Sequence, residues 1–97
     1  MRIRWLRTAL TQLEELPNWI EEDFRAAGND TVMLKVRGVI AAINQLAENP
    51  APETSRAGRI AGTREQPLLF GYYTLIYRVR GSVFEVLGVL PATCRPD

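Results

Sequence analysis

The stretch YTLIYRVR-GS-VFEVLGVL, residues 73–90, decides the fold of this 97-residue chain. Two runs rich in aromatic and β-branched residues flank Gly81-Ser82, a pair typical of a tight hairpin turn. They predict two antiparallel strands, and Pro91 ends the second because proline cannot donate to a strand ladder. Working outward, we expect a further strand from Arg59 to Leu69 with an irregular element at Gly62-Thr63, followed by a turn at Gly71.

Two amphipathic patterns precede these strands and predict two helices. Thr8 is placed to cap the first helix, and Pro17 predicts either a kink or a division into two shorter helices. Asn49-Pro50 ends the second helix. Apolar residues at spacings of three and four form the two stripes: Ala9, Leu13, Leu16, Ile20, Phe24 and Ala27 in the first, and Val32, Val36, Val39, Ile43 and Leu46 in the second.

Residues 1–6 alternate in character, with Ile3 and Trp5 on one face, which predicts a short strand. The order is therefore strand, helix, helix and three strands. It predicts an α+β fold in which two antiparallel helices pack on a twisted, mainly antiparallel sheet. A chain of this length suits a single domain over residues 1–97.

Composition excludes several classes of function. The single cysteine and the absence of histidine leave no internal disulfide and no zinc site, and we expect no metal or other cofactor. No apolar run approaches the ~20 residues of a membrane span, and no signal peptide is visible at the N-terminus, so we expect a cytoplasmic protein without membrane contact.

Charge is distributed unevenly although its sum is only +1. Residues 1–55 carry a net charge of −2, whereas residues 56–97 carry six arginines and three acids, a net of +3. Arginine offers a planar fork of donors suited to carboxylate or phosphate. The arginines of the second half are therefore candidates for contacts with a macromolecule, although each can equally be a solvated surface charge.

Five short pieces of the second half resemble, in order and spacing, the ParE branch of the RelE/ParE superfamily of bacterial toxins. They are Gly58-Arg59, Gly62-Thr63-Arg64-Glu65, Tyr77-Arg78-Val79, the run from Glu85 to Leu90, and Arg95-Pro96. The resemblance covers nearly the whole chain and implies the RelE/ParE-like fold. In this superfamily, ParE-like members poison DNA gyrase and RelE-like members cut messenger RNA on the ribosome. Both are silenced by a small antitoxin.

The residues favour the gyrase branch. Metal-free RNA cleavage needs a group that takes the 2′-hydroxyl proton, cations that stabilise the phosphorane, and an acid for the leaving oxygen. The nuclease branch uses lysines, arginines and a C-terminal Tyr or His–Tyr pair, whereas this chain has no His, no Tyr beyond Tyr77, and Thr74 at the position of an important arginine. We expect a protein-binding gyrase inhibitor rather than an enzyme.

The resemblance also assigns candidate site residues. Target contacts are expected from Arg59, Arg64, Arg95 and Pro96. Antitoxin contacts are expected from Leu10, Trp19, Tyr73 and Tyr77, although core packing is the competing interpretation for both tyrosines. If the chain is a nuclease instead, its catalytic groups are Arg64, Glu65, Arg78 and Arg95.

The expected partners are a cognate antitoxin of the ParD or RelB type, in a hetero-oligomer, and DNA gyrase as the target. Without antitoxin the chain is not expected to bind DNA directly. Two alternatives stay open beside gyrase inhibition. One is a ribosome-dependent mRNA endonuclease. The other is a non-toxic remnant that only binds antitoxin, because the segment from Pro91 to Asp97 lacks the histidine and the aromatic residue common in the ParE branch.

Overall fold

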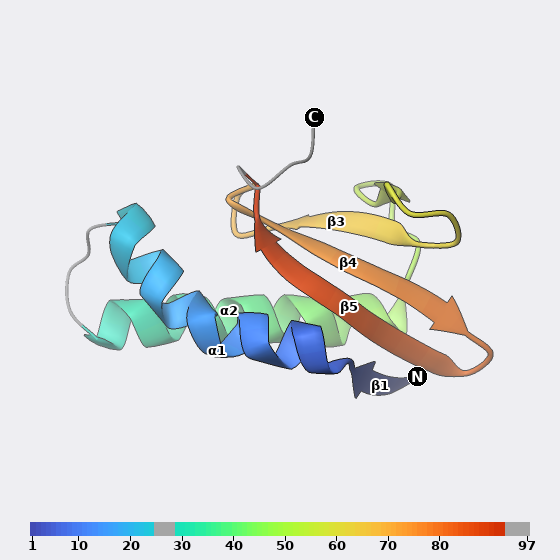
Figure 1. Cartoon of the computed structure of the whole chain (residues 1–97), viewed down its shortest axis with the longest axis horizontal. Coiled ribbons are helices and arrows are strands. Elements are labelled where there is room, and N and C mark those ends of the chain that lie inside the picture. Colours follow the sequence, from blue (N-terminus) through green and yellow to red (C-terminus); the bar gives the residue numbers. More distant parts are fainter. Residues whose placement is uncertain (25–28, 93–97) are drawn as a thin grey trace.

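The computed structural model describes residues 1–24 and 29–92, which form one sheet with two helices on one side of it (Figure 1). The strands are β1 (Arg2–Trp5), β2 (Arg56–Ala57), β3 (Arg64–Leu68), β4 (Tyr73–Arg80) and β5 (Val83–Pro91), in the order β1-β5-β4-β3-β2. β1 runs parallel to β5, and the other neighbouring strands are antiparallel. The predicted α+β class and arrangement are confirmed.

The helices are α1 (Arg7–Phe24) and α2 (Asn29–Glu48), which run in opposite directions beneath the strands (Figure 1). The stripe predicted for α2 is wholly buried, and Ala9, Leu16 and Ile20 of α1 are buried with it. The Gln12 side chain fixes α1 against the sheet, because its Oε1 accepts a hydrogen bond of 2.8 Å from the backbone N–H of Val89. Buried residues of the central strands complete the core: Tyr73, Leu75 and Tyr77 of β4, and Phe84, Val86 and Val89 of β5.

Several predicted boundaries are wrong in detail. α1 begins at Arg7, one residue before the predicted cap Thr8, and continues through Pro17 as one helix whose axis turns between its two halves (Figure 1). The strand predicted from Arg59 begins only at Arg64, because residues 58–63 close a turn. The short strand β2 was not predicted, since two residues carry no periodicity. Ala27 lies outside the described residues.

Candidate functional site

The sheet face turned away from the helices carries a charged cluster around Glu85. Strand pairing places Arg4 of β1 and Arg78 of β4 directly opposite Glu85 of β5 on this face. Arg78 Nε donates to Glu85 Oε1 at 2.5 Å, and Arg4 Nη1 lies 3.5 Å from Oε2. Arg80 adds a longer contact of 3.9 Å. The glutamate side chain is only 5% exposed, so three arginine side chains enclose a single carboxylate.

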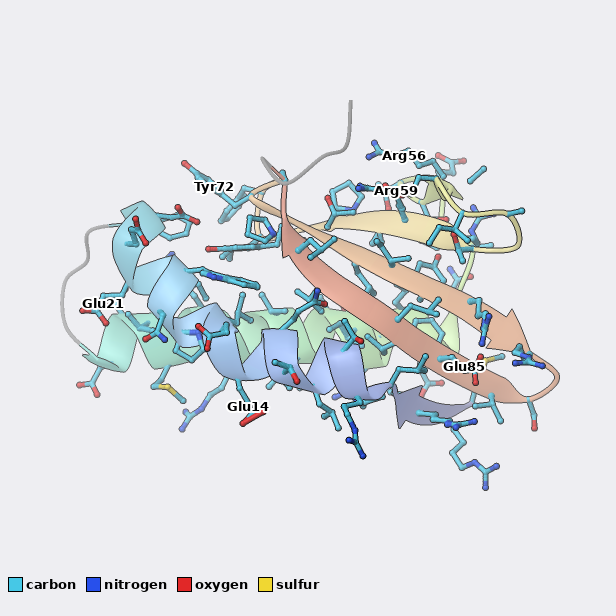
Figure 2. The ribbon with its side chains drawn as sticks, viewed as in Figure 1. Glu14, Glu21, Arg56, Arg59, Tyr72 and Glu85 are labelled. Atoms are coloured by element: carbon cyan, nitrogen blue, oxygen red, sulfur yellow. The ribbon has the colours of Figure 1, made fainter. Side chains whose placement is uncertain are left out.

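Glu65 on β3 is the centre of a second cluster. Arg56 of β2 pairs with Glu65 in register, and its Nη2 lies 3.5 Å from Oε1. Arg59 makes the stronger contact: its Nε donates to Oε2 at 2.8 Å, its Nη2 to Oε1 at 3.3 Å, and its backbone N–H to Oε2 at 2.9 Å. Figure 2 shows Arg56 and Arg59 together near β2, well separated from Glu85 at the hairpin end of the sheet.

The turn that delivers Arg59 depends on Gly58. The backbone N–H of Gly58 donates to Thr63 O at 2.8 Å, and Thr63 Oγ1 donates to Ile60 O at 2.6 Å. A Cβ at Gly58 would lie 2.1 Å from Thr63 Oγ1 and 3.0 Å from the Thr63 backbone, so no larger residue fits without movement. Gly62, at φ 81°, supplies the left-handed residue of the same turn.

The electrostatics of both clusters fix the carboxylates as anions. The hydrogen bond from Arg59 lowers the pKa of Glu65 to about 2, against an ordinary value of 4.5. The hydrogen bond from Arg78 likewise lowers the pKa of Glu85. A general base works best with a pKa near the operating pH, and each shift moves a carboxylate away from that range. The arrangement suits charge-assisted binding and rigidity better than proton transfer.

Two of the predicted target-binding arginines, Arg59 and Arg64, make hydrogen bonds within the chain. Arg59 is held by Glu65, as described above, and its side chain remains 25% exposed. Arg64 lies on the helix-side face and donates from Nε to Ser55 Oγ at 2.8 Å. Both side chains therefore fix the loop that precedes β3. Arg95 and Pro96 lie outside the described residues.

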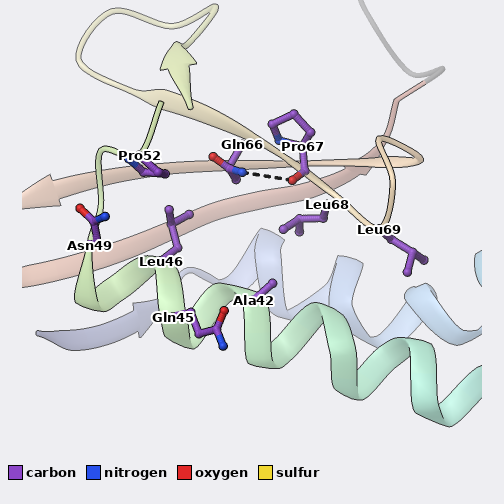
Figure 3. Close-up of a pocket in the computed structure, with 9 residues that line it drawn as sticks. All are labelled: Ala42, Gln45, Leu46, Asn49, Pro52, Gln66, Pro67, Leu68 and Leu69. Carbon is purple, nitrogen blue, oxygen red and sulfur yellow. Dashed lines mark hydrogen bonds between the residues drawn. The ribbon is translucent and has the colours of Figure 1, made fainter. Parts of the chain in front are cut away.

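An apolar groove of about 300 Å³ runs between α2 and β3 (Figure 3). Its walls come from the last turns of α2, from the loop that follows, and from the second half of β3. The lining residues are Ala42, Gln45, Leu46, Asn49, Pro52, Gln66, Pro67, Leu68 and Leu69. β2 pairs only with Arg64 and Glu65, so within the described chain the edge of β3 from Gln66 to Leu68 has no strand partner.

The predicted antitoxin contacts occupy different environments. Leu10 is 45% exposed and available at the surface, and Trp19 is half-buried. Tyr73 and Tyr77 are both 0% exposed, so neither ring reaches the surface of the chain described here. Tyr73 OH donates to Asp23 Oδ2 at 2.7 Å, and Tyr77 OH donates to Pro50 O. For these two tyrosines the structure shows the core-packing interpretation, because alternation in β4 turns them toward the helices.

Sequence reasoning missed the groove and the contacts of Arg4 and Arg80 with Glu85. The groove joins residues about 20 positions apart, and only the packing of α2 against β3 brings them together. Arg4 reaches Glu85 through the parallel pairing of β1 with β5, which no local pattern predicts, whereas Arg80 reaches it across the antiparallel β4–β5 hairpin. In the part of the chain that the structure describes, neither helix has the length and apolar character needed to cross a membrane.

Comparisons with known proteins agree with this geometry. The model of a family described as "ParE toxin of type II toxin-antitoxin system, parDE" matches residues 3–93. The chain is 38% identical over 91 residues to the protein named "Putative toxin Y4kP" of Sinorhizobium fredii, and the match covers 94% of this chain and 88% of that protein.

Solved structures share the fold. A structure described as the chromosomal ParDE TA system from P. aeruginosa superposes with a TM-score of 0.79 at 18% identity, covering 94% of this chain and 95% of that one. The toxin-antitoxin complex RelBE2 from Mycobacterium tuberculosis gives a TM-score of 0.61 at 22% identity, covering 93% and 95%. At such identities the likeness shows the α+β fold alone.

Fold and comparisons together define the class as the toxin half of a type II toxin–antitoxin pair. The chain belongs to the ParE toxin family. The resemblance drawn from the short pieces of the second half is thereby confirmed.

Proposed function

We propose that this ParE-family toxin arrests growth by binding and inhibiting DNA gyrase, and that a cognate antitoxin neutralises it. The observation that favours target binding over RNA cleavage is the ionised state of the two glutamates that the arginines enclose. Glu65 and Glu85 are buried, hydrogen-bonded carboxylates, and their lowered pKa values make both poor proton acceptors near neutral pH.

Two further observations weaken the nuclease alternative. Thr74, which stands where the nuclease branch carries an arginine, is only 4% exposed and bears no charge. Arg64, one of the cations that a phosphorane would need, already donates to Ser55. In the gyrase proposal, Arg59, Arg64, Arg95 and Pro96 belong to the target surface. Arg59 and Arg64 act there mainly by holding the loop before β3 in place.

A supercoiling assay with purified gyrase and antitoxin-free toxin tests the proposal. We expect dose-dependent loss of supercoiling, accumulation of cleaved complexes, and reversal by antitoxin. Full supercoiling activity at saturating toxin would rule out the gyrase proposal. New 5′ ends in translated messages, lost on Arg64→Ala, would establish the endonuclease instead. Undisturbed growth after induction without antitoxin would leave only the non-toxic remnant.

The antitoxin is proposed to occupy the groove between α2 and β3. A groove with an open strand edge at its rim suits an extended peptide, which can pair with that edge and place alternate apolar side chains in the groove. Part of this site is preformed, because Leu46 and Leu68 are 6% and 4% exposed and fixed by the core. Leu10 and Trp19 on α1 are proposed as further contacts.

Neighbouring alanines of α2 give a matched test of this antitoxin site. Ala42 lines the groove, whereas Ala41 is exposed one position away along the helix. Ala42→Arg should weaken antitoxin binding about tenfold or more by filling the groove, and Ala41→Arg should bind normally. Equal affinities in a titration would place the antitoxin elsewhere.

A further inference from the structure

The turn between β3 and β4 holds three successive residues in the left-handed region. Their φ values are 49° at Leu69, 58° at Phe70 and 86° at Gly71. Hydrogen bonds of 3.1 Å from Gly71 N–H to Leu68 O and from Tyr72 N–H to Leu69 O close the turn. Only glycine adopts this conformation without steric cost, so Leu69 and Phe70 hold strained backbone.

The two strained residues differ in the contacts that offset the backbone strain. Leu69 is half-buried, packs against the core and lines the groove beside α2. Phe70 is 91% exposed, which makes it the most exposed large apolar side chain among the described residues. Its ring therefore gains almost nothing from the fold. A strained residue with a solvent-facing aromatic ring points to a contact outside the chain.

Contacts of the neighbouring residues hold the backbone around Phe70 in place. Tyr72, two residues on and 48% exposed, packs its ring 4.7 Å from that of Phe24 at the end of α1. Tyr72 O also accepts a hydrogen bond of 2.9 Å from Ala92 N–H after β5. The turn is thus anchored by α1, β3, β4 and the end of β5, so the backbone that carries Phe70 is in place before any partner arrives.

We propose that Phe70 is the anchor by which the toxin binds its cellular target, entering an apolar pocket of a folded protein. Shape separates this surface from the antitoxin site. A hollow such as the α2–β3 groove takes an extended segment, whereas a protruding ring needs a concave pocket, which a folded domain has and an extended segment lacks. An aromatic side chain on a fixed backbone also loses little freedom on binding, because it has few rotatable bonds.

The inference rests on the proposed function only in that the toxin acts on a protein, and it does not depend on gyrase being that protein. Three variants test it. Phe70→Ala removes the ring, and Phe70→Asn removes it with a residue that tolerates the left-handed conformation. Leu34→Ala removes a comparable apolar group, 65% exposed on α2, and serves as the matched control.

We expect both Phe70 variants to need about tenfold or more toxin for the same growth arrest, and the same rise in the toxin concentration that halves gyrase supercoiling. Phe70→Asn should melt at or above the wild-type temperature, because strain is relieved, and all three variants should bind antitoxin with unchanged affinity. Leu34→Ala should arrest growth as the wild type does.

Other outcomes would overturn the anchor. If Phe70→Asn arrests growth as strongly as the wild type, Phe70 is not the anchor. If the Phe70 variants lose antitoxin affinity and keep their toxicity, the ring binds the antitoxin instead. A concentration-dependent dimer that dissociates on Phe70→Ala, seen by sedimentation, would assign it to a second copy of the chain. If the wild-type toxin leaves gyrase active but growth arrest still requires Phe70, the gyrase proposal is refuted and the role of Phe70 as the anchor stands.

Discussion

Glu65 keeps its charge in a buried position because Arg59 approaches it with both the guanidinium group and the backbone N–H. Replacing both partners of a buried ion pair together changes stability little. Removing one partner leaves the other as a buried charge without compensation. The value of the pair lies in fixing one geometry for the loop that precedes β3.

The pH dependence of stability should report this pair. A carboxylate with a depressed folded-state pKa contributes stability that is fully present above its ordinary value of 4.5 and is lost as the pH falls through about 2. We expect a loss of ~1–2 kcal/mol over this window after allowance for screening by water. Chemical unfolding of the wild type and Glu65→Gln from pH 7 to pH 2 measures it. The variant should be less stable at pH 7 and show a flatter profile, and parallel profiles would refute the role of Glu65.

Gly58 and Gly38 should respond in opposite directions to the same substitution. Gly58→Ala forces a Cβ against Thr63 and should destabilise the fold by about 2 kcal/mol. Gly38→Ala, within α2 and with no side chain or other element within 4 Å of the added Cβ, should stabilise it by about 0.5–1 kcal/mol. Thermal unfolding of the two variants measures both changes in stability. An unchanged stability of Gly58→Ala would show that the turn accommodates the Cβ by a small shift.

At the residue scale the sequence predicts burial better than it predicts partners. Alternation and helical spacing identified the core positions of both helices and of β4, because burial follows a local period. The partner of each arginine depends on strand register and on a six-residue turn, which local patterns do not contain. Phe70 escaped notice for a related reason: an apolar residue next to Gly71 continues the strand pattern unless the left-handed turn is known.

Among the elements, α1 is the one whose second half reaches the end of the sheet where the β3–β4 turn lies. Its axis turns partway along, and the last turns then bring Trp19 to 6.4 Å from the Tyr73 ring and Asp23 to the Tyr73 hydroxyl. Proline removes one backbone hydrogen bond and clashes with the preceding turn, so Pro17 accounts for the change in direction. The bend was predicted from the sequence, whereas the contacts it permits were not.

The Tyr73 hydroxyl should act as the tether of this helix end. Burial and the neighbouring Asp23 both raise the pKa of Tyr73, so the hydroxyl remains a donor throughout the physiological range. Tyr73→Phe should lower the free energy of unfolding by about 1 kcal/mol. Tyr72→Phe, in a half-exposed ring, should change it by less than about 0.5 kcal/mol. Equal effects in urea titrations would show that the bond to Asp23 contributes nothing.

For the molecule as a whole, the core is small, so binding of a partner should add measurably to the stability of the fold. A ligand that binds only the folded state at 100 times its dissociation constant adds about 2.7 kcal/mol. For a domain of this size the melting temperature should then rise by on the order of 10 °C when antitoxin is added in that excess. Scanning calorimetry of the complex measures the shift, and a melting temperature independent of antitoxin concentration would contradict the linkage.

Whole-molecule features were predicted unequally. The element order, helix stripes and hairpin turn implied helices over an antiparallel sheet, because each follows from local chemistry. The parallel pairing of β1 with β5 and the groove between α2 and β3 are products of tertiary assembly. No spacing along the chain indicates them.

The pairing of Arg2–Trp5 with Val83–Val86 has a consequence for synthesis. The first strand leaves the ribosome long before β5, its sheet neighbour among the described residues. About eighty residues are translated between the two, and they include both helices and the strands β2 to β4. Long-range pairing of this kind is slow and comes late in folding. A nascent chain therefore cannot complete its sheet until the last strand has emerged from the ribosome.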